Sequence, residues 1–423
     1  MKRRHLLGLG LAATAGGAWL LRPAAQGGPH NPYFSALNTL LKNEGPGRPL
    51  MLLDLDRLDA NAAKLHASQP AGKAFRVVAK SLPSPQLIKH VASAVQTKRL
   101  MVFHQPHLNA LAVDTPDADL LLGKPMPVHA AATFYKNLGK TAFAPERQLQ
   151  WLIDTPERLQ EYRQLAQQLG TTIRVNIEVD VGLHRGGLQE PADLKPLLDM
   201  IAADPAQLHF AGLMGYDAHV GKIPTIIETR DKSFELACAR YRAFQQVLHD
   251  NYPQWVTTDT VFNGAGSPTL RLHGDPRSGL NELSGGSCLV KPADFDLDLL
   301  ADLQPAVFIA TPVLKLMRGS HIPGLGAANA LVSGWNPNFE KTYFIYGGLW
   351  MARYESPPGL IDNPLYGKSS NQAIVNSSSR VPLAVDDYIF LRPTQSEKVM
   401  LEFGDIAVIK RGKLVDWWPV LPT

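Results

Sequence analysis

From about residue 75 the chain alternates short apolar segments, rich in residues that favour strands, with longer segments of helical periodicity. Eight predicted strands can be counted in this region. They lie near residues 75–80, 99–104, 118–123, 149–154, 172–180, 210–216, 260–263 and 281–289. Eight strand–helix units in about this length predict an α/β fold, a (β/α)8 TIM-type barrel. A doubly wound parallel sheet is the alternative, but its glycine-rich fingerprint does not follow the first strand.

The pattern changes after about residue 304. Short apolar segments are there separated by Gly, Pro and Asn, which is typical of an all-β domain. The predicted strands of this region lie near residues 307–310, 330–333, 342–346, 387–391 and 406–409. We therefore divide the chain into a leader at residues 1–28, an N-terminal strand with the barrel at 45–304, and a C-terminal β domain at 305–423.

The N-terminus resembles an export signal. Arg3 and Arg4 precede a weakly apolar stretch, residues 6–21, that is rich in Gly and Ala. This layout predicts export by the twin-arginine route and a periplasmic location. The stretch is short for a permanent membrane span. Because Pro23 disturbs a cleavage motif around Ala25, an uncleaved membrane anchor stays open, as does a buried or disordered N-terminal segment.

Composition excludes several functional classes. The formal net charge is only +4 over 423 residues, and no block of Lys and Arg is long enough to predict nucleic acid binding. The two cysteines, Cys238 and Cys288, have neither metal-ligand spacing nor the number expected of a disulfide framework.

Two candidate residues follow predicted barrel strands, where barrel enzymes build their active sites. Lys80 ends the first strand, and an amine in a partly dry pocket can form a Schiff base with an aldehyde. Arg185, in the glycine-rich turn at residues 178–187, can hold a phenolate oxygen or a ring nitrogen. The simpler alternatives are a surface lysine and a structural ion pair.

Small residues follow the seventh and eighth strands, and backbone N–H groups there can reach an anion such as phosphate. Tyr216, at the end of the sixth strand, can pack on a ring or hydrogen-bond to it. The candidate phosphate ligands are Asn263, Gly264, Ala265, Gly266, Ser267 and Ser287. Each motif alone is also typical of an ordinary turn. A Schiff-base lysine, a phosphate cradle and an arginine or tyrosine for the ring are together the parts needed to hold pyridoxal 5′-phosphate.

With these motifs in order, the chain resembles the alanine-racemase-type (fold type III) pyridoxal-phosphate enzymes, and within them the D-threonine aldolase/D-serine dehydratase-like branch. The resemblance covers residue 45 to the C-terminus. Its motifs are LLDLD at 52–56, AK at 79–80, VDVGxxRxG at 179–187, GLxxY at 212–216, the glycine-rich loop at 263–267 and ELxxGS at 282–287. The resemblance implies that Lys80 forms the Schiff base, Arg185 contacts the cofactor ring and the 263–267 loop binds phosphate. It also implies a homodimer, with the β domain of one subunit near the partner's barrel mouth.

One departure from the family concerns its metal. Metal-dependent members carry a His-x-Cys or His-x-Asp pair after a Gly-Asp strand, whereas residues 404–418 contain no histidine and only a lone Asp416 as a candidate ligand. Upstream, the usual acidic residue and histidine are replaced by Ser-Glu-Lys at 396–398. We therefore predict that this protein holds no metal.

Other residues are then needed as acids and bases. His219, after the sixth strand, is a candidate acid or base, the alternative being a solvated loop histidine. Tyr354 or Tyr366, in a stretch predicted to be irregular, is a candidate second base reaching the partner's site.

These features predict an enzyme that acts on a D-amino acid, most consistent with a lyase, either an aldolase or a dehydratase of a 3-hydroxy amino acid. A racemase is the next alternative. A non-catalytic pyridoxal-phosphate-binding protein is a rival, but such proteins lack a C-terminal β domain. A sugar- or phosphate-binding barrel in which Lys80 is only a charge is the last rival, and it predicts no coloured Schiff base.

Overall fold

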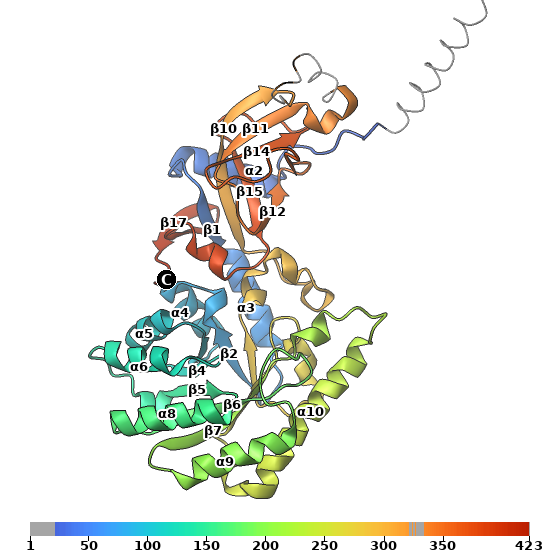
Figure 1. Ribbon diagram of the computed structural model, residues 1–423. Helices are drawn as coiled ribbons and strands as arrows, with labels where there is room; N and C mark the ends of the chain where they lie inside the picture. Colours follow the sequence, from blue (N-terminus) through green and yellow to red (C-terminus); the bar gives the residue numbers. More distant parts are fainter. Residues whose placement is uncertain (1–21, 321–323, 325, 327–333, 423) are drawn as a thin grey trace, which may run out of the picture. The chain divides into compact units, whose positions relative to one another are not determined.

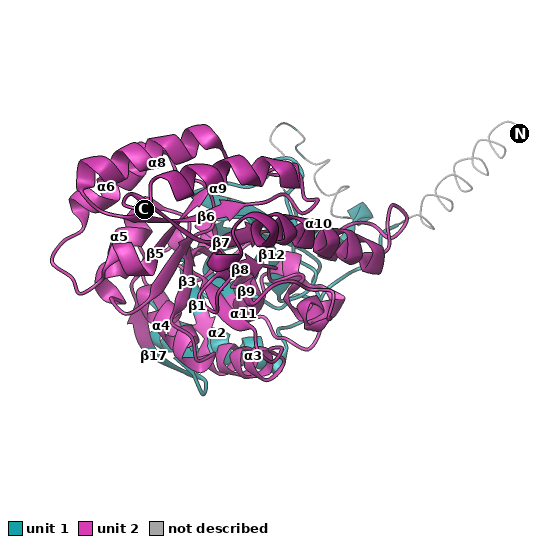
Figure 2. Ribbon diagram, turned by 90° about the horizontal axis from the view of Figure 1, so that it is seen from below, with its two compact units in different colours: residues 1–52, 308–393, 409–415 teal, residues 53–307, 394–408, 416–423 magenta. Residues whose placement is uncertain are grey.

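The computed structural model describes residues 22–320, 324, 326 and 334–422. The predicted leader's arginines and the strand predicted at 330–333 lie outside the described residues. The chain forms two compact units that interleave along the sequence (Figure 2). One unit takes its described residues from 1–52, 308–393 and 409–415, and the other consists of 53–307, 394–408 and 416–423. The sequence-based division instead placed the N-terminal strand with the barrel and drew a single boundary between barrel and β domain, near residue 304.

Eight parallel strands close the barrel of the second unit (Figure 1). They are β2 (Ala74–Val78), β3 (Arg99–Val102), β4 (Asp119–Leu122), β5 (Leu149–Ile153), β6 (Ile173–Glu178), β7 (Leu208–Gly215), β8 (Val261–Gly264) and β9 (Glu282–Gly285). Each strand pairs with the next, and β9 returns to β2 with Phe75 opposite Leu283. The predicted (β/α)8 barrel is confirmed.

Helices follow the strands as the periodicity predicted, except that α7 and α11 were not predicted and α11 occupies the end of the segment predicted as the strand 281–289. They are α3 (Leu55–Ala67), α4 (Pro85–Ala94), α5 (Gln105–Asp114), α6 (Val128–Asn137), α7 (Pro145–Gln148), α8 (Pro156–Leu169), α9 (Leu194–Ala203), α10 (Arg230–Asn251) and α11 (Ser287–Val290). Helix α8 shows how the local sequence determines where a helix begins and ends. Thr155 caps its N-terminus through its side chain, a proline opens the first turn, and Gly170 ends it at φ +62°.

The other unit is built on antiparallel strands. They are β10 (Val307–Arg318), β11 (Lys341–Tyr346), β12 (Ala352–Ser356), β13 (Ile361–Asp362), β14 (Gln372–Ser377) and β15 (Tyr388–Pro393). The sheet runs in the order β13-β14-β11-β10 and continues through β1 (Leu50–Asp54), β16 (Ile406–Lys410) and β17 (Lys413–Trp418). The stretch predicted to be irregular, residues 347–371, contains β12 and β13.

Helix α2 (Pro32–Glu44) was not predicted from the sequence. Asn31 caps it, and its buried face carries Phe34, whose ring lies 5.1 Å from that of Phe308 and 5.0 Å from that of Phe390. The capping residue before Pro32 was a usable signal. No helix among the described residues is long and apolar enough to cross a membrane.

Candidate active site

A cavity of about 400 Å³ lies at the carboxyl ends of the barrel strands, within the barrel unit. It brings together most of the residues singled out in the sequence. Those lining it are Lys80, Arg185, Tyr216, Asn263, Ala265, Gly266, Ser267 and Ser287. They come from five strand ends, and they meet because parallel strands present all their carboxyl ends at one rim.

Lys80 stands on a short 3₁₀ turn, Ala79–Ser81, directly after β2. Its Nζ lies 2.7 Å from Oε1 of Glu397 and 4.3 Å from the centroid of the Phe103 ring. Its side chain is 28% exposed, so the amine faces the cavity rather than bulk water. The surface-lysine alternative does not fit this position.

Arg185 and Tyr216 form one wall of the cavity. The guanidinium carbon lies 4.7 Å from the centroid of the Tyr216 ring, a cation–π contact. Burial raises the pKa of Tyr216, so its hydroxyl stays protonated at neutral pH. Gly266 packs against the same ring, and a Cβ there would lie only 2.4 Å from the ring's Cε2. The ring position therefore depends on glycine at 266.

The loops after β8 and β9 form the adjoining wall. Oγ of Ser267 accepts hydrogen bonds from the backbone N–H groups of Gly286, at 3.3 Å, and Cys288, at 3.0 Å. Oγ of Ser287 donates to Oγ of Ser81 at 3.0 Å. A Cβ on Gly286 would lie 2.7 Å from the carbonyl oxygen of Val78. Hydrogen bonds thus join the two loops, and the residues that face the cavity are small.

Lys222 also lines this cavity and was not predicted. Its Nζ lies 5.5 Å from the centroid of the Phe295 ring. Among the residues that the structure describes, no carboxylate lies within ion-pair distance of this ammonium. Gly221, its neighbour, packs on Pro268, which places the charge beside the 263–267 loop.

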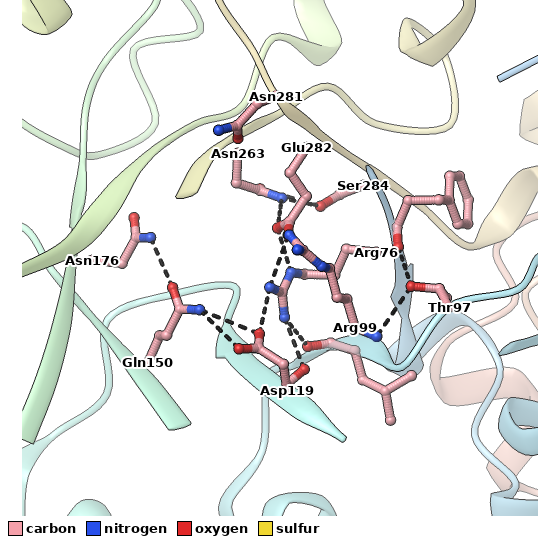
Figure 3. A network of polar contacts seen from close by, with 12 residues as sticks. Arg76, Thr97, Arg99, Asp119, Gln150, Asn176, Asn263, Asn281, Glu282 and Ser284 are labelled. Atoms are coloured by element: carbon pink, nitrogen blue, oxygen red, sulfur yellow. Dashed lines mark hydrogen bonds and ion pairs between the residues drawn. The ribbon is translucent and has the colours of Figure 1, made fainter. Parts of the chain in front are cut away.

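The floor of the cavity rests on a buried network inside the barrel (Figure 3). The Asn263 amide donates to Oγ of Ser284 and to Oε1 of Glu282, both at 2.8 Å. Glu282 pairs with Arg76 and Arg99, each at 2.5 Å, and Arg76 and Glu282 are fully buried. Although burial alone would raise it, the two arginines hold the pKa of Glu282 below its ordinary value. A network of charge-assisted hydrogen bonds of this kind gives the floor a fixed geometry.

Two predicted residues are placed elsewhere. Gly264, the last residue of β8, is packed against Leu280 and does not line the cavity. The His219 ring lies against Gly182, also off the cavity, and its buried Nδ1 has no hydrogen-bond partner. Burial lowers the pKa of His219, which favours the neutral ring. An acid or base role for His219 therefore has no support from its position.

The two tyrosines proposed as second bases do not line this cavity within the chain. The Tyr354 hydroxyl donates to Oδ1 of Asp362 at 2.7 Å, and Tyr366 is exposed. Gln395 and Glu397, by contrast, line the cavity, although the sequence analysis noted Glu397 only as a departure from the metal motif. Both precede β16. The periodicity of the sequence does not indicate that residues so far along the chain lie beside Lys80.

The residues present fit pyridoxal 5′-phosphate. Lys80 offers the amine for its aldehyde, and Arg185 and Tyr216 offer a wall for its ring. The loops at Gly266–Ser267 and Gly286–Ser287, where added Cβ atoms would clash, form a cradle for its phosphate, with Lys222 beside it. Within the described ranges, no three His, Cys, Asp or Glu side chains are grouped as a metal site.

Comparison with known proteins agrees with this reading of the fold. Residues 53–293 match the family model described as alanine racemase, N-terminal domain. A search of the curated proteins found no match. Among solved structures, D-threonine aldolase from Filomicrobium marinum superimposes with a TM-score of 0.67 at 18% identity, over 88% of this chain and 94% of that one.

Two further solved structures carry the same fold. D-threo-3-hydroxyaspartate dehydratase from Delftia sp. HT23 has a TM-score of 0.62 at 16% identity. Alanine racemase from Bacillus anthracis has a TM-score of 0.61 at 14% identity. Each alignment covers 88% of this chain and 97% of the other. The chain therefore belongs to the alanine racemase N-terminal domain family, the fold type III enzymes that use pyridoxal 5′-phosphate.

Proposed function

We propose that this protein is a pyridoxal-phosphate-dependent lyase that acts on a D-amino acid, as an aldolase or as a dehydratase of a D-3-hydroxy amino acid. The observation that carries the proposal is the placement of Lys80 in one cavity with the glycine- and serine-lined cradle. The likeness to a D-threonine aldolase and a D-threo-3-hydroxyaspartate dehydratase supports the choice of reaction.

The residues of the chain would have the following roles in binding the cofactor and in proton transfer. The cofactor, when bound, supplies an electron sink for a bond at the substrate's Cα. Lys80 would hold or release a proton at Nζ, which lies against the Phe103 ring. Arg185, fixed on the ring of Tyr216, orients the cofactor ring. Backbone N–H groups of the cradle and the charge of Lys222 bind the phosphate.

The test of the cofactor is an absorption spectrum of the purified protein before and after borohydride reduction, with Lys80→Ala in parallel. We expect a visible Schiff-base band that reduction fixes on Lys80 and that the variant lacks. Lys89→Ala is the matched control, because Lys89 is also paired with a carboxylate at 2.8 Å but lies on the surface. A protein that shows no band after reconstitution with pyridoxal phosphate would leave the sugar- or phosphate-binding barrel as the better explanation.

The reaction is tested on a panel of D-amino acids, with and without a chelator. A lyase releases glycine and an aldehyde, or an oxo acid and ammonia, from a D-3-hydroxy amino acid, and we expect the chelator to leave its rate unchanged. A racemase, the alternative, produces the L-enantiomer instead. No turnover despite a bound cofactor would favour a non-catalytic pyridoxal-phosphate-binding protein.

We propose that the protein is exported to the periplasm by the twin-arginine route. The adjacent Arg3 and Arg4 before an apolar stretch support this location. Replacing both by lysine is expected to retain the protein in the cytoplasm, as measured by cell fractionation. Periplasmic recovery of the double variant would contradict this route, and recovery in the membrane fraction would indicate an uncleaved anchor.

A further inference from the structure

Beyond the cradle and the lysine, the cavity holds one carboxylate in direct contact with the reacting amine. We propose that Glu397 is a catalytic residue that carries protons between Nζ of Lys80 and solvent. This inference rests on the proposed function, since Lys80 must gain and lose a proton during any reaction at Cα.

The geometry suits proton transfer. Oε1 of Glu397 lies 2.7 Å from Nζ of Lys80, which is the range of a charge-assisted hydrogen bond. The Glu397 side chain is 42% exposed and that of Lys80 is 28% exposed. The carboxylate therefore touches the amine on one side and water on the other, and it lines the same cavity.

A well-anchored turn presents this carboxylate. Glu397 directly precedes the short 3₁₀ turn Lys398–Leu401, in which Val399 and Met400 are buried. Upstream, the Gln395 side chain donates to Oδ2 of Asp294 at 2.8 Å. Anchors on both sides of Glu397 restrict where its carboxylate can lie, which is the requirement for a group that acts on one defined atom.

The surrounding charges leave the carboxylate as the acceptor for this proton. His104 does not line the cavity, and burial, followed by the charges of Lys124 and Lys80, lowers its pKa and makes its ring a weaker base. Tyr216 and Arg185 face the same space, and burial keeps the tyrosine protonated. Neither the neutral phenol nor the arginine accepts a proton at neutral pH. The described cavity wall thus holds a single anionic side chain, that of Glu397.

The proton balance is simple. The Lys80 ammonium gives one proton to the Glu397 carboxylate, which leaves a neutral amine and a carboxylic acid. The acid then returns the proton to the amine or releases it to water and becomes a carboxylate again. No oxidant, reductant or other reactant is consumed.

The first test uses the cofactor-free protein. Lys80 is labelled with trinitrobenzenesulfonate at a series of pH values, and its peptide is quantified by mass spectrometry. Glu397→Gln removes the ion pair at the Lys80 amine, so Lys80 should be labelled several-fold faster in the variant than in the wild type at a given pH. The Lys89–Asp114 pair serves as the internal reference in the same digest. Glu402→Gln, from the same segment but off the cavity, should leave the Lys80 curve unchanged.

The second test uses the holoenzyme and separates proton transfer from a structural role. Glu397→Ala should retain the borohydride-fixed band but lose turnover on the order of 100-fold, as expected for a lost general acid–base group. Added formate should restore part of that turnover in the alanine variant and none in Lys80→Ala. Formate is small enough to occupy the space of the missing carboxylate.

The outcomes are distinguishable. Superimposed labelling curves for Glu397→Gln and the wild type, or turnover unaffected by Glu397→Ala, would overturn the role of Glu397 while leaving the cofactor intact. Failure of the wild type to form the reducible band would instead overturn the proposed function. A misfolded Glu397→Ala variant would lack the reducible band and would not be rescued by formate. A folded variant that has lost only the carboxylate would show the band and would respond to formate.

Discussion

At the scale of single residues, the site depends on two glycines, because a side chain at either position would clash with its neighbours. Gly266 lies against Tyr216, and Gly286 lies against the carbonyl of Val78. Neither glycine has a backbone φ in the left-handed region, so the requirement is close approach rather than conformation. Glycine at these positions lets the two loops pack directly against the Tyr216 ring and the end of β2.

Gly266→Ala tests this requirement. The added methyl would sit 2.4 Å from the Tyr216 ring, so the ring must move or the loop must shift. We expect a loss of stability of about 1–3 kcal/mol, measured by chemical unfolding, and weaker retention of pyridoxal phosphate in equilibrium dialysis. Gly139→Ala is the control, since nothing lies within 4 Å of its added methyl. Unchanged cofactor affinity in Gly266→Ala would show that the Tyr216 ring does not matter for binding.

A second residue-scale feature is Glu178, the last residue of β6, which faces Arg185 across the turn. Burial, followed by the charges of Asp154 and Asp180, raises its pKa to about 7. Because the folded pKa exceeds the ordinary value of 4.5, the folded state holds this proton more tightly. Its contribution to stability is complete below about pH 4.5 and is lost as pH rises through 7.

Glu178→Gln removes that titration. The difference in unfolding free energy between wild type and variant should change between pH 4.5 and 7 with a slope of at most about 1.4 kcal/mol per pH unit, the wild type becoming relatively less stable. Chemical unfolding at several pH values measures it. A difference that is constant across this range would mean that Glu178 titrates at its ordinary pH.

At the scale of elements, the interior of the barrel contains buried ion pairs between strands as well as apolar side chains. Arg76 on β2 and Glu282 on β9 pair at the seam where the last strand returns to the first. Arg76 also contacts Oδ1 of Asp119 on β4, at 2.6 Å. These two contacts link β2, β4 and β9, and the network drawn in Figure 3 also includes Arg99 of β3 and Asn263 of β8.

Removing the charge of Glu282 should lower the free energy of unfolding, because the Arg76 guanidinium stays buried. Glu282→Gln leaves the charge of Arg76 with one carboxylate fewer, and we expect a loss of about 3–5 kcal/mol in chemical unfolding. Asp117→Asn breaks the exposed pair with Lys98 and should cost no more than about 1 kcal/mol. Equal effects of the two variants would show that water reaches Arg76.

At the scale of the whole molecule, the expectation of a homodimer is a proposal that rests on the family resemblance. Sedimentation should then give twice the chain mass of 46.3 kDa. If the partner supplies a second base, a mixture of Lys80→Ala with a variant lacking both Tyr354 and Tyr366 should regain activity through one intact site. A monomeric mass at micromolar concentration would contradict the proposal.

Much of this protein follows from the sequence by itself. The order of strands and helices is local, because periodicity, caps and prolines act within a few residues, as at α8. The placement of Lys80, Arg185, Tyr216 and the 263–267 loop around one cavity also follows, because a parallel barrel gathers its strand ends at one rim.

Only the tertiary structure decided the remainder. Glu397 reaches Lys80 from more than 300 residues away, and Lys222 turns toward the cradle while nearby His219 turns away from the cavity. The two units interleave, so that residues 394–408 complete the barrel unit. Side-chain direction on a loop and contacts between distant segments depend on how the whole chain packs, and no short-range pattern in the sequence records them.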